Sequence, residues 1–150
     1  MKVYKKLLSY VPNLKAIVFF AMICSFVSCL LTNYGYYLIY KFLKALIVDS
    51  SLDMSEIFAI KIAVFIFLGV LLYFLSLLLA HKVGFHLENV LRKKGVEGLN
   101  KASFRFFDTN SSGSIRKIID DNAALTHTII AHLIPDNTKA FTMPILILIL

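Results

Sequence analysis

Four histidines are the first candidates for chemistry in this chain of 150 residues. His81 and His86 are spaced five residues apart, and so are His127 and His132. Histidines can bind a metal together, but a spacing of five corresponds to about 500° around a helix, so the two members of a pair do not share a face. The sequence therefore predicts solvated or interfacial histidines and no metal site.

Two pairs of acidic residues are the next candidates. Glu88 with Glu97, and Asp120 with Asp121, could in principle act as general acid and base. A solvated surface and helix caps explain these carboxylates more simply. The chain also lacks the phosphate-binding glycine loop, the dinucleotide fingerprint, the zinc-protease motif and the serine nucleophile elbow. We therefore expect no catalytic residue and no cofactor site.

Cys24 and Cys29 both lie inside an apolar run, and their spacing fits no metal-ligand pattern. We expect buried free thiols. The basic N-terminus followed by "FVSC", residues 26–29, also resembles a lipoprotein cleavage site. The apolar run continues well past that point, however, and is too long for an ordinary signal sequence.

The elements that must position these residues are membrane helices. Hydrophobic residues make up 59% of the chain, against roughly 45–50% in soluble domains. Residues 16–40 and 62–80 contain no charge, and each run is long enough for a hydrocarbon core of about 30 Å. A third run begins near Ala140 and is still apolar at Leu150. We therefore expect an all-α chain that is the N-terminal fragment of a longer membrane protein.

The distribution of charge predicts the topology. The chain has 16 Lys and Arg against 9 Asp and Glu, and the excess flanks the N-terminus and the second connection. Cytoplasmic loops carry such an excess, so the N-terminus is predicted to be cytoplasmic and the short connection between the spans external. That connection has no room for a sensing domain. The excess indicates a multi-pass membrane protein rather than a partner of nucleic acid.

The N-terminal segment is predicted to be an interfacial helix over residues 1–12. One face carries Tyr4, Leu7, Leu8 and Val11, with lysines largely opposite. A frayed basic tail is the alternative. The first span is expected over residues 13–48. Asp53 and Glu56 then have the spacing of a capping box for the second helix.

The second helix is predicted to run over residues 55–107, with a span followed by a cytoplasmic extension. The polar segment after it carries Gly113 as a permissive hinge. A short helix is expected over residues 112–120, starting at Ser112 or Ser114 and crossing the cytoplasmic tip. Asp120 or Asp121 would cap the next helix, which starts the third span over residues 121–150.

These features together resemble the transmembrane domain of ABC transporters with the exporter-type (type IV) fold. That family shows Phe-[Phe/Tyr]-Asp, a few polar residues, Gly, and a short amphipathic segment that ends in Asn-Asp-Val. In "FFDTNSSGSIRKIIDDN", residues 106–122, the Phe-Phe-Asp and Gly elements match. Asp120 replaces the usual Asn, Asp121 matches, and Asn122 departs from Val. The resemblance covers essentially the whole chain.

The resemblance implies that the short helix is a coupling helix, which rests on a nucleotide-binding domain and transmits its ATP-driven closure. The predicted coupling residues are Ser112, Gly113, Ser114, Ile115, Arg116, Lys117, Ile118, Ile119, Asp120 and Asp121. It further implies ATP and Mg bound by a nucleotide-binding domain later in the same chain. A second half-transporter, identical or different, and a bacterial cytoplasmic membrane complete the expected setting.

A second resemblance concerns the cargo. "AHLIPD", residues 131–136, with Pro144 further on, is similar to a subgroup of siderophore-uptake half-transporters of the yersiniabactin and mycobactin type. It implies import of a siderophore or metal chelate, although Pro135 can also act simply as a helix kink. Export of a drug, lipid or peptide is the alternative. A two-span membrane signalling protein is the alternative from a different class.

Overall fold

The computed structural model describes residues 2–49 and 55–149, and within these ranges every secondary-structure element is helical. The all-α prediction is therefore confirmed. Asp53, half of the predicted capping box, lies outside the described residues. In chain order the elements are α1 (Lys2–Ser9), η1 (Pro12–Leu14), α2 (Lys15–Lys44), η2 (Ala45–Asp49), α3 (Ser55–Asn100), α4 (Phe104–Thr109), α5 (Ser112–Arg116), η3 (Lys117–Asp121) and α6 (Asn122–Ile149).

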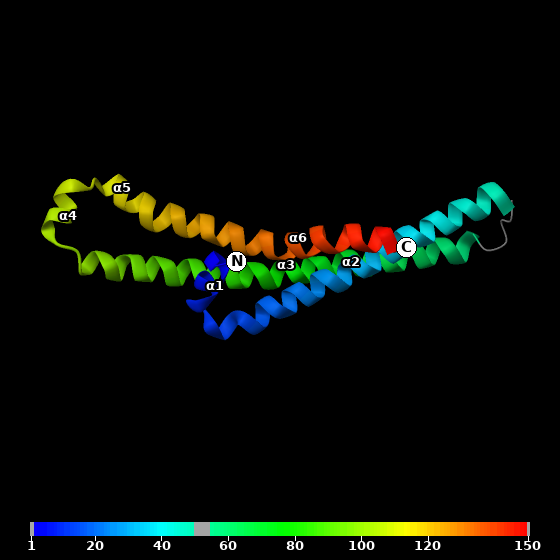
Figure 1. The fold of residues 1–150 in the computed structure, drawn as a ribbon, viewed down its shortest axis with the longest axis horizontal. Helices are drawn as coiled ribbons and strands as arrows, with labels where there is room; N and C mark the ends of the chain where they lie inside the picture. Colours follow the sequence, from blue (N-terminus) through cyan, green and yellow to red (C-terminus); the bar gives the residue numbers. More distant parts are fainter. Residues whose placement is uncertain (1, 50–54, 150) are drawn as a thin grey trace. The chain divides into compact units, whose positions relative to one another are not determined.

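The chain forms two compact units. The first consists of Met1–Phe19 and Leu78–Ile134, and the second of Phe20–Leu77 and Pro135–Leu150. In the first unit, the later part of α3 and the early part of α6 lie side by side, with α4 at the turn between them (Figure 1). Each unit is held together by a different kind of packing.

The first unit has a small hydrophobic core in which α1 takes part. Val11 and Val18 pack with Val83, Leu87 and Ile130 from the long helices, and the side chains of α1 that lie against this cluster are Leu7 and Leu8. The amphipathic character predicted for residues 1–12 is thus confirmed for Leu7, Leu8 and Val11. Pro12 then begins η1, where its fixed φ suits the first turn of a helix.

The second unit is packed through small residues. Ser28 Oγ donates to the Gly69 carbonyl at 2.7 Å, and Ser76 Oγ donates to the Ala21 carbonyl at 2.7 Å, so α2 and α3 approach closely. Ser25 Oγ donates to the Pro135 carbonyl at 2.8 Å, which ties α2 to α6. Small residues and interhelical hydrogen bonds are the usual cement of helices in lipid. Cys29 is a fully buried free thiol, as expected, whereas Cys24 is a free thiol that is only partly buried, so the expectation of burial is wrong for Cys24.

Among the residues that the structure describes, two helices are long and apolar enough to cross a membrane, Pro12–Ile47 and Glu56–Asn100. Only 28% of the most apolar window of the first is buried, and 11% of that of the second. A core helix of a soluble protein would bury most of this surface. Exposed apolar surface of such extent indicates contact with lipid or with further helices.

Two predicted boundaries are wrong. Helix α3 ends at Asn100 rather than at residue 107, because Ser103 adopts an extended backbone that starts the separate helix α4. The break expected at Asp120 or Asp121 is also absent, since the backbone stays helical through η3 into α6. The predicted crosswise helix is therefore the start of a longer helical run, and α4 makes the turn at the tip (Figure 1).

Candidate coupling interface

The start of the predicted coupling segment is defined by a side-chain cap. Ser111 has an extended backbone, with φ −67° and ψ 153°, and its Oγ accepts a hydrogen bond from the Ser114 amide at 3.2 Å. A serine at this position satisfies an amide that the first helical turn leaves without a partner. The helix consequently begins at Ser112, one of the two starts that the sequence predicted.

Replacing Ser111 with alanine is expected to loosen this first turn. The lost cap corresponds to about 1 kcal/mol of local helix stability. Amide hydrogen exchange at residues 112–115 should accelerate several-fold, whereas the matched change Ser112→Ala, at an exposed position beside the cap, should leave it unchanged. Equal exchange rates in both variants would contradict the capping role.

Gly113 is not a hinge in this structure. It lies inside α5, its φ is outside the left-handed region, and an added Cβ would meet nothing within 4 Å. Neither backbone freedom nor space therefore requires glycine here. The hinge interpretation is corrected: the chain turns before Ser111, not at Gly113.

Of the three isoleucines on the predicted apolar face of the segment, two are partly buried against the chain and one is exposed. Ile119 packs against α3 at Gly95, where an added Cβ would lie 3.0 Å from the Ile119 side chain. Ile115 is partly buried, but Ile118 is 55% exposed. Ile118 is therefore the isoleucine of the three that is most available to a partner domain.

Two phenylalanines of the preceding helix α4 are also exposed. Phe104 is 91% exposed and Phe107 is 45% exposed, both on α4. Phe107 carries part of the family resemblance, but neither phenylalanine was predicted to be a docking residue. The signal available was the placement of large aromatic side chains beside a polar turn.

Charged side chains link the segment to α3. Arg92 Nη2 contacts Glu88 at 2.8 Å and Arg92 Nε lies 3.5 Å from Asp120, while Arg116 Nε lies 3.9 Å from the same carboxylate. Arg92 Nε has no well-aligned hydrogen-bond acceptor among the described residues. Its contact with Asp120 is therefore electrostatic, and partly exposed pairs of this kind position a segment more than they stabilise the fold.

Histidines from different helices lie close together in the first unit. Spacing along one helix cannot predict such contacts, so they were not expected from the sequence. His81 Nδ1 lies 3.3 Å from His127 Nε2, and the His81 and His132 ring centroids are 5.0 Å apart. His127 Nδ1 lies 3.1 Å from a Glu88 oxygen. Among the described residues, no group of three or more His, Cys, Asp and Glu side chains is placed to hold a metal ion.

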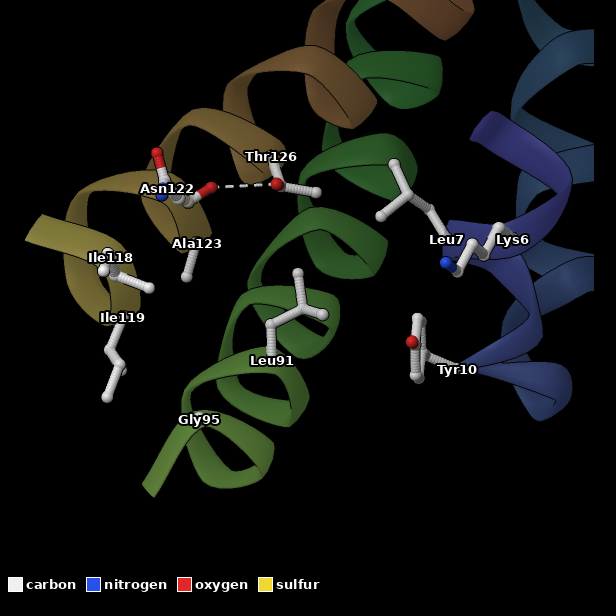
Figure 2. Close-up of a pocket in the computed structure, with 10 residues that line it drawn as sticks. All are labelled: Lys6, Leu7, Tyr10, Leu91, Gly95, Ile118, Ile119, Asn122, Ala123 and Thr126. Carbon is white, nitrogen blue, oxygen red and sulfur yellow. Dashed lines mark hydrogen bonds between the residues drawn. The ribbon is translucent and has the colours of Figure 1, made fainter. Parts of the chain in front are cut away.

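An open groove of about 530 Å³ separates α1 from the coupling segment (Figure 2). Leu7 of α1 and Tyr10, just after α1, line one side of the groove. Leu91 and Gly95 of α3 and the neighbouring Ile119 line the other side. Lys94 Nζ lies 4.5 Å from the centre of the Tyr10 ring, a cation–π distance. Most of the groove lining is apolar, and Lys6, Asn122 and Thr126 add polar groups to it.

The geometry thus presents a capped, exposed tip at the end of long apolar helices. Comparison with known families agrees with it: residues 18–150 match the ABC transporter transmembrane region. Comparison with curated proteins gives no match. A membrane domain of this kind works together with a nucleotide-binding domain. Because the match extends over most of its length, the chain belongs to the family of ABC transporter transmembrane regions.

Proposed function

We propose that this chain forms part of the permease of a bacterial importer that takes up a siderophore or metal chelate across the cytoplasmic membrane. The family supports an ATP-driven permease. In this proposal the N-terminus lies in the cytoplasm, and a second half-transporter completes the substrate pathway. A nucleotide-binding domain in the same chain binds ATP and Mg.

One observation carries the coupling role: α3 continues well beyond its charge-free run. That run ends at Ala80 and the helix ends at Asn100, so the extension is about 30 Å long at 1.5 Å per residue. Such a stiff helix is suited to carry a rigid-body motion between the tip and the membrane. Residues 112–121 are the segment that we assign to contact with the nucleotide-binding domain.

The direction and cargo rest on the resemblance of residues 131–136 to siderophore-uptake half-transporters. Within α6, Pro135 stands inside a continuous helix, with its carbonyl bonded to Ser25. It is therefore not a helix end. An exporter built on the same fold would share this architecture, so transport measurements must separate the two directions.

The test uses the transporter assembled with its nucleotide-binding domains, in cells and in oriented vesicles. The ferric complex of 2,3-dihydroxybenzoylserine, labelled with iron-55, and a panel of other labelled ferric chelates are supplied outside. We expect ATP-dependent accumulation on the cytoplasmic side. Depletion from the cytoplasmic side would instead establish an exporter, and no ATP-dependent movement of any chelate would refute this cargo class.

A further inference from the structure

A polar cluster lies between α3 and α6 in the second unit. The Tyr73 hydroxyl donates a hydrogen bond to Asp136 Oδ1. Lys139 Nζ lies 4.0 Å from the centre of the Tyr73 ring, so the ammonium group rests on the aromatic face. We refer to Tyr73, Asp136 and Lys139 as the Tyr73 cluster.

The depth of this cluster follows from the position of Tyr73. Tyr73 lies in the charge-free run of residues 62–80, twelve residues after Lys61 and eight before His81. At 1.5 Å per residue these separations are about 18 Å and 12 Å along the helix. Tyr73 is therefore far from both ends of the run, and the side chains that contact it lie within the hydrocarbon zone of the membrane.

The cluster is nevertheless not enclosed by the described part of the chain. Asp136 is exposed, its neighbour Asn137 is exposed, and Lys139 is only partly buried. Lipid tails cannot solvate a carboxylate and an ammonium group. Ionisable side chains at this depth face the interior of a helix bundle or a water-filled cavity, and they commonly mark the path of a substrate.

We propose that the Tyr73 cluster lines the water-filled substrate pathway and binds the transported solute directly. This inference rests on the proposed function, which it deepens by naming a contact site. The ligand class is a hydrophilic solute with a carboxylate or phenolate oxygen beside an N–H or O–H group.

The chemistry of the cluster selects that class. Lys139 is held over the ring face by a cation–π contact, which leaves its N–H donors free to meet an anionic oxygen. One oxygen of Asp136 accepts a hydrogen bond from the Tyr73 hydroxyl, and the carboxylate can still accept a hydrogen bond from a donor on the solute. An apolar cation would pair only with Asp136, and a hydrocarbon chain would pair with neither charge, so the site discriminates against both.

Access of water to the cluster can be tested with a membrane-impermeant methanethiosulfonate reagent in the assembled transporter. The reporter is Asn137→Cys in a background in which Cys24 and Cys29 are replaced by alanine, so that Asp136 and Lys139 remain intact. The matched control is Phe74→Cys, which replaces an exposed apolar side chain next to Tyr73 on α3. We expect Asn137→Cys to react without nucleotide and Phe74→Cys to stay unreactive. Failure of Asn137→Cys to react faster than the control would overturn the inference.

The ligand class is tested by protection of the same reporter. The ferric complex of 2,3-dihydroxybenzoylserine carries anionic oxygens and an N–H group, and it should slow the labelling about tenfold, as expected for charge-assisted contacts. Tetraphenylphosphonium, an apolar cation, should give no protection. The protection should be lost in Lys139→Gln and retained in Lys139→Arg. Equal protection by both compounds, or protection that persists in Lys139→Gln, would refute the assignment.

The outcomes separate this inference from the proposed function. ATP-dependent accumulation of the labelled chelate is measured in the same vesicles and does not depend on thiol labelling. Normal uptake with an unreactive or unprotected reporter would refute the role of the Tyr73 cluster and leave the importer assignment in place. A reporter that is reactive and protected, in a transporter that shows no uptake, would refute the importer assignment and leave the role of the Tyr73 cluster in place.

Discussion

Replacing Ile118 with aspartate is expected to abolish transport and to lower substrate-stimulated ATP hydrolysis at least about tenfold, while the protein still inserts into the membrane. Ile118 is 55% exposed, so a charge there would disturb the proposed docking surface rather than the buried core. Loss of an apolar anchor at the centre of an interface typically costs about 2 kcal/mol or more of binding. The measurement is ATP turnover with and without substrate in proteoliposomes.

Two variants on the same segment serve as controls. Ile118→Val keeps an apolar side chain and should retain most of the coupling. Gly113→Ala should be neutral, because α5 is helical at that residue and an added Cβ meets nothing within 4 Å. Normal substrate-stimulated turnover and transport in the Ile118→Asp protein would show that residues 112–121 do not couple the two domains.

The second large effect is expected at Gly69, where alanine should destabilise the packing of α2 on α3. The added Cβ would lie 2.6 Å from Thr32 Oγ1 and 3.2 Å from the Ser28 carbonyl oxygen. The hydroxyl can rotate away but the backbone cannot, so the helices must separate. Overpacking of this kind typically costs about 1–3 kcal/mol. The change should appear as a lower thermal midpoint and a smaller monodisperse fraction in detergent.

The same substitution elsewhere on α3 is the matched control. Gly98→Ala adds a methyl group into open space, with nothing within 4 Å. Because alanine favours a helix over glycine by up to about 1 kcal/mol, this variant should be neutral or slightly more stable. If Gly69→Ala were as stable as Gly98→Ala, the close approach of α2 and α3 would be wrong.

Local patterns predicted much of the architecture. Charge-free runs located both membrane helices, and serine-rich sequence located the start of the helix at Ser112. These features depend on residues that are close together in the chain. The length and periodicity of an apolar segment and the capping residues at its ends act without tertiary contacts. Residues 106–122 likewise indicated an ABC transporter transmembrane region, which the match over residues 18–150 confirms.

Where two local signals competed, the prediction was wrong. The second helix was predicted to run unbroken to residue 107, yet the chain leaves the helix after Asn100 and restarts at Phe104. At Asp120 and Asp121 the reverse occurs, since residues suited to a cap remain inside a continuous helical run. Capping residues permit a boundary, but packing decides whether the backbone uses it.

The amino-acid sequence by itself determined an all-α membrane protein, two of its spans and the polar segment between α3 and α6. Only the tertiary structure decided which side chains meet across helices: Ile119 with Gly95, His81 with His127, and Tyr73 with Asp136 and Lys139. Each of these contacts depends on the relative rotation and register of two helices far apart in the chain. Helical periodicity states which face a residue occupies, but it does not state what that face will meet.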